Sequence, residues 1–132
     1  MREITLKTDR HTQLIEITEL VRDALGDTNG AAAALVYVPH TTAGVTINER
    51  IDPDLVQDFE EAYEKVVNDE WTWRHSDADG PNAPSHFRAS LASPQVLIPL
   101  RDGSLSLGTY QGIFFCEFDG PRTRTVLVTP LQ

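Results

Sequence analysis

Three of the four histidines in this chain lie in segments rich in turn-forming and polar residues. His40 comes directly after an apolar run, while His75 and His86 flank a stretch of Ser, Asp, Ala, Gly, Pro and Asn. A histidine beside turn residues can present a ring nitrogen to a ligand, and three converging imidazoles suit a zinc-type ion with an open coordination position. The sequence therefore predicts a metal site, with ordinary surface or hydrogen-bonded histidines as the alternative. His11, beside Arg10, is expected at the surface.

Acidic, basic and amide side chains near these histidines are candidates for chemistry. Glu49 is the preferred general base on a metal-bound water, because it ends the strand that is predicted to start after His40. The alternative is that Glu49 only helps to start the helix that follows. Arg122 has a planar guanidinium that suits contact with a substrate phosphate. Asn82 is a candidate for substrate binding, with turn formation as its alternative.

A glycine-flanked segment supplies two further substrate-binding candidates. Gly108 and Gly112 enclose Tyr110 and Gln111 between two predicted strands. Glycines at such a position admit close approach of a ligand to the backbone, although they are equally typical of a β-bulge. In this interpretation the aromatic ring of Tyr110 stacks on a heterocycle and Gln111 lies beside it.

Strand-like segments outnumber helices and are joined by short turns, which predicts an α+β fold in a single domain over residues 1–132. The main helix is expected to begin at Asp52, with Pro53 in its first turn and apolar side chains at helical spacing as far as Val67. We expect this one long helix, together with shorter helices, to cover a mainly antiparallel β-sheet or sandwich.

Two local expectations concern the segments around the histidines. Ser85 is expected to cap a short helix that contains His86. The strand-like segments Gly112–Phe118 and Thr123–Thr129 are expected to pair with each other around the turn that separates them.

Composition and charge exclude several classes of protein. The formal charge is −9, with 20 acidic residues against 11 basic ones, so nucleic-acid binding would start from an unfavourable electrostatic term. The longest apolar run, Ala31–Val38, is far shorter than a membrane span, and the first residues lack the apolar core of a signal peptide. We therefore expect a cytoplasmic protein without nucleic-acid or membrane partners. The single cysteine, Cys116, excludes an internal disulfide and is expected to be a buried structural thiol.

Four motifs in their order along the chain resemble the YjbQ-like family, and together they cover nearly the whole sequence. They are His40–Glu49, then His75 with Asn82–His86, then Gly108–Ile113, and finally Glu117 with Asp119–Arg122. Tyr110 stands where this family commonly has tryptophan, a change that preserves an aromatic ring. The resemblance implies a compact α+β fold, a homotrimer, and a metal held by His40, His75 and His86.

The family is also associated with a secondary thiamine-phosphate synthase activity. That reaction joins a hydroxymethylpyrimidine diphosphate to a thiazole phosphate and releases pyrophosphate, so the resemblance implies a phosphorylated small-molecule substrate. Three imidazoles favour zinc or another transition metal, whereas displacement of a diphosphate usually recruits magnesium, which prefers oxygen ligands. We expect a divalent metal, with zinc first and magnesium as the alternative.

Three functions are consistent with the sequence. The first is a transferase of the thiamine-phosphate synthase type. The second is a metal-dependent hydrolase in which a histidine-bound water is activated by Glu49. The third is a trimeric protein that binds a metal or small ligand without turnover.

Overall fold

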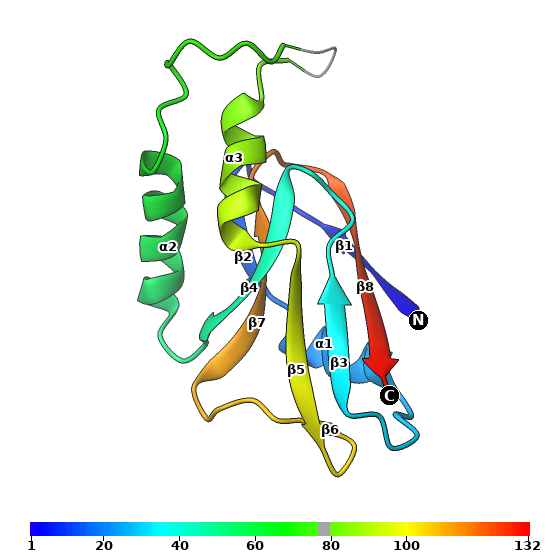
Figure 1. Cartoon of the computed structure of the whole chain (residues 1–132). Coiled ribbons are helices and arrows are strands. Elements are labelled where there is room, and N and C mark those ends of the chain that lie inside the picture. Colours follow the sequence, from blue (N-terminus) through cyan, green and yellow to red (C-terminus); the bar gives the residue numbers. More distant parts are fainter. Residues whose placement is uncertain (77–79) are drawn as a thin grey trace.

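The strands of the described residues, 1–76 and 80–132, form two antiparallel sheets, as Figure 1 shows for this computed structural model. They are β1 (Arg2–Lys7), β2 (Gln13–Glu16), β3 (Ala33–Tyr37), β4 (Ala43–Glu49), β5 (Gln95–Arg101), β6 (Ser104–Leu105), β7 (Gln111–Glu117) and β8 (Thr123–Leu131). The larger sheet has the order β1-β8-β3-β5-β6 and the smaller one β2-β7-β4. The predicted α+β class and antiparallel pairing are confirmed.

The inner faces of the two sheets form the main hydrophobic core. Side chains alternate along each strand, so Val126 and Val128 of β8 point inward from the larger sheet while Ile113 and Phe115 of β7 point inward from the smaller one. All four side chains are buried, and each burial of this kind contributes roughly 1.5–3 kcal/mol. This contact fixes the two sheets relative to each other.

Three helices complete the described part of the chain: α1 (Thr18–Leu25), α2 (Pro53–Lys65) and α3 (Ala83–Ala92). Helices α2 and α3 lie side by side against the outer face of the smaller sheet (Figure 1), where Phe114 of β7 packs in a second cluster with Ala89 of α3 and Phe59 of α2. Val21 of α1 joins the core between the sheets. The three helices have 13, 10 and 8 residues, and the expectation was one long helix together with shorter ones.

Close approach of α3 to the smaller sheet depends on a glycine in β4. A Cβ atom at Gly44 would lie 2.7 Å from the carbonyl oxygen of Ser93, which follows α3. Helix α3 begins after Asn82, and Ser85 lies inside the helix, where its hydroxyl donates a 2.5 Å hydrogen bond to the Phe118 carbonyl. The expectation that Ser85 caps this helix was therefore wrong, because the serine ties α3 to the end of β7 instead.

Consecutive strands β7 and β8 lie in different sheets, so the predicted pairing between them was wrong. Strand β7 pairs with β2 and β4, whereas β8 pairs with β1 and β3. Residues 118–122 carry the chain from one sheet to the other. Apolar alternation identifies a strand but does not identify its partner, which is why the sequence did not show this crossing.

The cysteine expectation is confirmed. Cys116 is a residue of β7, and its side chain is fully buried in the cluster beneath α2 and α3. Burial raises the pKa of its thiol. No helix within the described residues is both long enough and apolar enough to cross a membrane.

Helix α2 offers a direct test of the sequence signals that start it. The Asp52 side chain accepts a 2.9 Å hydrogen bond from the Asp54 N–H, and Pro53 occupies the first turn. Asp52→Ala is expected to lower the free energy of unfolding by about 1 kcal/mol, measured by urea denaturation. Asp58→Ala removes the same charge from the exposed face of this helix and is expected to change stability by less than about 0.5 kcal/mol. Equal losses in the two variants would contradict the assigned cap.

Candidate functional site

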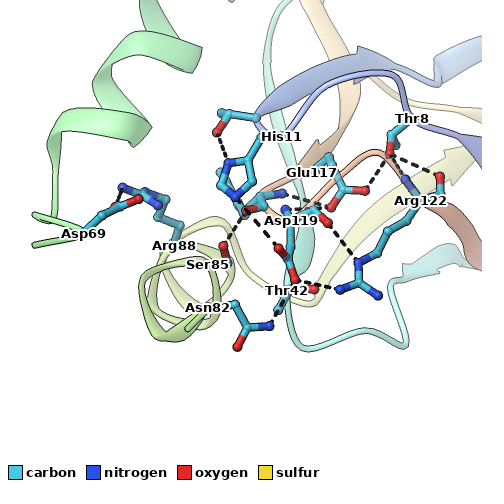
Figure 2. A network of polar contacts seen from close by, with 12 residues as sticks. Thr8, His11, Thr42, Asp69, Asn82, Ser85, Arg88, Glu117, Asp119 and Arg122 are labelled. Carbon is cyan, nitrogen blue, oxygen red and sulfur yellow. Dashed lines mark hydrogen bonds and ion pairs between the residues drawn. The ribbon is translucent and has the colours of Figure 1, made fainter. Parts of the chain in front are cut away.

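A polar cleft of about 320 Å³ opens where the β3–β4 connection, the start of α3 and the crossing between β7 and β8 meet. The residues that line it are Pro39, His40, Thr41, Thr42, Asn82, His86, Asp119, Arg122 and Arg124. The fold thus brings His40, Asn82, His86 and Arg122, four of the residues predicted for the site, to one place. Figure 2 shows the polar network beside this cleft.

A buried ion pair between Glu117, the last residue of β7, and Arg124 of β8 forms the base of that network. Arg124 Nε donates to Glu117 Oε1 at 2.9 Å, and Arg124 Nη2 pairs with Oε2. The Thr8 hydroxyl donates to the same carboxylate at 2.7 Å, and Arg124 Nη2 also donates to Thr42 Oγ1 at 2.8 Å. The pair therefore joins the two sheets, the segment after β1 and the segment before β4.

Burial and hydrogen bonding act in opposite directions on Glu117. Burial alone would raise the pKa of this carboxyl group, but hydrogen bonds from Arg124, Thr8 and the Asp119 N–H, with the charge of Arg124, hold the pKa below its ordinary 4.5. Glu117 is therefore a carboxylate with all of its strong acceptor positions engaged. Its role is structural, because none of its surface is exposed.

The Glu117 carboxylate also sets the path of the crossing that follows it. Glu117 Oε2 accepts hydrogen bonds from the backbone N–H groups of Phe118 at 3.1 Å and Asp119 at 3.0 Å. A Cβ atom at Gly120 would collide with the Arg10 carbonyl oxygen and lie 2.8 Å from Thr8 Oγ1. The crossing thus fits closely against the N-terminal turn, which fixes the direction of the Asp119 side chain.

Asp119 connects the crossing to the start of α3. Its Oδ2 accepts hydrogen bonds from Asn82 Nδ2 at 3.0 Å and Arg122 Nη2 at 2.9 Å, as Figure 2 shows. Arg122 Nε donates to the Asp119 carbonyl oxygen at 2.9 Å, and His11 Nε2 lies 3.8 Å from Oδ1. The Arg122 side chain remains 39% exposed, so its guanidinium can contact an anion in the cleft while Asp119 holds it.

The histidines have different surroundings. His75 Nε2 lies 3.1 Å from Asn82 Oδ1, and the rings of His75 and His86 meet edge to face with centroids 5.0 Å apart. His86 Nε2 is buried, and within the described residues it has no hydrogen-bond partner. His40 Nε2 accepts a 3.0 Å hydrogen bond from the Thr125 N–H. Burial, followed by the positive charge of Arg124, lowers the pKa of His40 below 6.5.

The three histidines fit a metal ion to different degrees. The buried Nε2 of His86 can act as a metal ligand, and the ring of His75 is close enough to share an ion with it. The Nε2 lone pair of His40 is already engaged by Thr125, so this ring would have to exchange that bond in order to bind a metal. Within residues 1–76 and 80–132, no group of three or more His, Cys, Asp or Glu side chains is arranged to hold an ion.

Glu49, Tyr110 and Gln111, three other residues predicted for the site, do not line the histidine cleft of this chain. Glu49 pairs with Gln111 at the far end of β4, six residues beyond Ala43, which corresponds to about 20 Å along the strand. It lines a separate small cavity with Leu14. Within this chain Glu49 therefore lies away from His40 and His86, because a seven-residue strand carries its two ends apart, and its role as a general base stays a prediction.

Sequence reasoning did not single out two residues that the structure places in the network. Arg124 lies on the same inward-facing side of β8 as Val126 and Val128, and a charged residue at such a position of an apolar strand is the signal that could have indicated a buried ion pair. Thr8 carries no comparable signal, since its partner Glu117 is 109 residues away.

Fold and cleft together define an α+β protein with two packed antiparallel sheets and a histidine-lined polar cleft where the chain crosses between them. A family model described as UPF0047 protein YjbQ-like matches residues 2–132. The chain belongs to this YjbQ-like family.

Similar proteins support this assignment over the full length. The UPF0047 protein YugU of Bacillus subtilis is 39% identical, covering 97% of this chain and 96% of YugU, and a UPF0047 protein of Archaeoglobus fulgidus is 42% identical, covering 98% and 99%. The crystal structure of a yjbq/upf0047 family protein from Clostridium acetobutylicum has a TM-score of 0.91 at 41% identity, with 99% and 100% coverage. Hypothetical protein APE1520 from Aeropyrum pernix has a TM-score of 0.84 at 36% identity, with 98% and 96% coverage.

The depressed pKa of Glu117 predicts how the buried pair responds to acid. Its stabilising contribution is present above the unfolded-state value of about 4.5 and is lost as the pH falls through the lower folded-state value. The double variant Glu117→Leu, Arg124→Met lacks this contribution. Below about pH 4.5, wild-type stability is expected to fall more steeply than that of the double variant, by up to about 1.4 kcal/mol per pH unit.

Urea denaturation between neutral and acidic pH measures this difference. Because both proteins carry the same remaining carboxylates, subtracting the two curves isolates the Glu117 contribution. Parallel curves over the whole range would show that Glu117 is not held ionised by Arg124.

Proposed function

We propose that this protein is a metal-dependent enzyme that acts on a phosphorylated small molecule in the cleft beside His86. The reaction type that we propose is that of a thiamine-phosphate synthase, in which a pyrimidine diphosphate is joined to a thiazole phosphate and pyrophosphate leaves. The single observation that carries the proposal is the buried, unpartnered Nε2 of His86, within the described residues, in a cleft that also contains Arg122.

An unpaired buried nitrogen is unfavourable unless a ligand satisfies it. Leaving a buried polar group without a partner costs about 1–3 kcal/mol, and a divalent ion is a natural partner for a neutral imidazole. We assign the ion to His86 and the neighbouring His75, with His40 joining by exchange of its bond to Thr125. The lowered pKa of His40 favours the neutral ring that metal binding requires. Such an ion, when bound, supplies positive charge against a diphosphate leaving group.

Arg122 is the group that we assign to the substrate phosphate. Its guanidinium is held by Asp119 and is partly exposed, so its orientation is set before an anion arrives. The hydroxyl-bearing residues Thr41 and Thr42 line the same cleft, and its volume of about 320 Å³ matches small-molecule sites. Because the chain carries a net charge of −9, anion binding would depend on such a local cationic group.

The hydrolytic alternative with Glu49 as base has no support from the cleft, since Glu49 lies at the other end of β4. Stacking of a substrate ring on Tyr110 of the same chain is likewise not supported, because Tyr110 precedes β7 at that same end. Asp119 is the carboxylate that lines the histidine cleft beside Asn82 and Arg122. A protein that binds metal and phosphate without turnover is the outcome that the activity test below separates from an enzyme.

Metal removal and substitution of Arg122 test the enzymatic proposal. Thiamine phosphate formation from the two phosphorylated precursors is expected to require zinc or magnesium, and Arg122→Ala is expected to reduce kcat/KM by about 100-fold, because a charged phosphate contact is worth roughly 1.5–3 kcal/mol. Arg101→Ala, which removes an exposed arginine at the end of β5, is the matched control and should leave activity unchanged. Equal rates with and without metal, or an active Arg122→Ala, would refute the proposal.

Metal content is measured on the same proteins, purified without a histidine tag. His86→Ala is expected to lose the bound ion, whereas His11→Ala should retain it. Stoichiometric metal without any product formation would favour the non-catalytic binding protein.

The homotrimer implied by the resemblance also belongs to this proposal, and the outer face of the larger sheet is the surface that we assign to it. Side chains that point outward from β3, β5 and β8 include Tyr37, Leu97 and Leu131, which are 38%, 59% and 39% exposed. Leu97 lies opposite Leu35 in register, and Tyr37 opposite Leu127, so the apolar side chains adjoin. A contiguous apolar surface of this kind marks a protein–protein contact.

Leu97→Glu tests this assignment, because a charge at the centre of an apolar contact is unfavourable. We expect sedimentation to show a trimer for the wild type and a monomer for Leu97→Glu. Val66→Glu, on the exposed surface of the segment after α2, is the matched control and should remain a trimer. A wild-type monomer, or a trimeric Leu97→Glu, would contradict the assignment.

A further inference from the structure

Arg124 is bonded to the protein along only one edge of its guanidinium group. Its Nε donates to Glu117 Oε1 at 2.9 Å, while its Nη2 pairs with Glu117 Oε2 and donates to Thr42 Oγ1 at 2.8 Å. All hydrogen bonds of Arg124 within residues 1–76 and 80–132 use these two nitrogens. Nη1, which carries two further N–H donors, is therefore not used by the ion pair.

This remaining nitrogen of Arg124 faces the cleft. In the described part of the chain, His86 Nε2 is the only buried side-chain nitrogen or oxygen without a hydrogen-bond partner. Arg124 Nη1 also has no partner there, so it must belong to the 5% of this side chain that is exposed. Because Arg124 lines the cleft, its outer edge reaches the cleft from a nearly buried position.

Arg122 is held in the same way. Its Nε donates to the Asp119 carbonyl oxygen and its Nη2 donates to Asp119 Oδ2, both at 2.9 Å. Its Nη1 makes no hydrogen bond to any described residue, and its side chain is 39% exposed in the same cleft. Two guanidinium groups thus present their outer edges to one cleft, Arg124 from its base and Arg122 from its rim.

Thr42 adds a third donor at this position. Because Thr42 Oγ1 accepts a hydrogen bond from Arg124, its hydroxyl proton points away from that arginine, and it has no acceptor among the residues that the structure describes. Asn82, which precedes the first residue of α3, lines the same cleft, and the first turn of this helix contains no acidic residue. The positive end of the helix dipole therefore also lies beside these donors.

We propose that Arg124 is a substrate-binding residue, which together with Arg122 and Thr42 binds one tetrahedral phosphoryl group of the substrate at the base of the cleft. This inference rests on the proposed function, in which only Arg122 was assigned to phosphate, and adds the residue that receives the buried side of the anion. A phosphoryl group offers several acceptor oxygens to these donors, whereas a planar carboxylate offers two.

The two carboxylates beside the arginines explain how such a site works in an acidic protein. Glu117 and Asp119 formally balance the two positive charges and lie along the inner edges of the guanidinium groups. The anion is therefore held by the direction of the outer N–H donors, and net charge contributes little. An ion pair that served stability alone would not require the outer edge of Arg124 to remain at the cleft surface.

Isothermal titration calorimetry of the metal-free full chain with inorganic phosphate, and separately with pyrophosphate, tests the site. Arg124→Lys keeps a positive charge beside Glu117 but removes the outer N–H edge, and we expect it to weaken binding by about 10–100-fold. Arg122→Lys should have an effect of similar size. Acetate should bind the wild type at least about 10-fold more weakly than phosphate, and equal affinity for acetate would overturn the assignment to a tetrahedral anion.

Two further variants separate binding from stability. The double variant Glu117→Leu, Arg124→Met removes the arginine without leaving a buried charge, and it should lose at least as much phosphate affinity as Arg124→Lys. Arg88→Lys is the matched control, because Arg88 is 2% exposed, pairs with the Asp69 carboxylate at 2.7 Å and lines a different cavity. It should keep full phosphate affinity. Urea denaturation checks that each variant is folded. Unchanged affinity in both Arg124 variants would overturn the proposal.

Nitrogen NMR of the guanidinium groups in the wild type needs no substitution at the site. Saturation with phosphate should shift the signals of Arg122 and Arg124 and leave Arg88 unchanged, and a shift of Arg122 alone would contradict the role of Arg124. Phosphate binding without metal binding or product formation would refute the proposed function and leave this anion site standing. Zinc binding without binding of phosphate or pyrophosphate would overturn the anion site instead.

Discussion

The buried ion pair between Glu117 and Arg124 is the interaction on which the rest of this structure depends. It lies where the chain leaves the smaller sheet and enters the larger one, and its two side chains are 0% and 5% exposed. Removing one partner of such a pair typically costs 3–5 kcal/mol, because the other charge is left buried. Here hydrogen bonds from Thr8 and to Thr42 complete the pair, so one contact ties the crossing between the sheets to two segments that are distant in sequence.

A chain of hydrogen bonds connects this ion pair in the core to the residues of the cleft. Glu117 holds the backbone of Asp119, Asp119 holds Asn82 and Arg122, and Asn82 meets His75. The network satisfies its buried polar atoms, apart from His86 Nε2, which has no hydrogen-bond partner within the described part of the chain. Because buried polar atoms are normally hydrogen-bonded, a nitrogen without a partner beside paired carboxylates and guanidinium groups indicates a position for a ligand. The proposed metal and phosphate sites rest on this difference between His86 and its neighbours.

Local signals in the sequence were read correctly where a single element decides the outcome. Asp52 caps α2 as predicted, and Cys116 is buried as predicted. The sequence did not show that β7 and β8 lie in different sheets, because strand alternation determines which face is buried and leaves the partner open. Glu49 was predicted for the histidine site because it ends the strand that starts after His40, although that strand holds the two residues apart. The buried position of Arg124 had a local signal, a charged residue on the inward-facing side of an apolar strand, but its contacts with Glu117 and Thr42 depend on how the chain crosses between the sheets.

The histidine cleft as a metal site is the central claim, and diffraction at the zinc absorption edge tests it most directly. Crystals grown with zinc and pyrophosphate should give an anomalous peak within bonding distance of His86 Nε2 and a ring nitrogen of His75, with pyrophosphate beside Arg122. An anomalous map without a peak at His86, or with zinc only at surface carboxylates, would contradict the account.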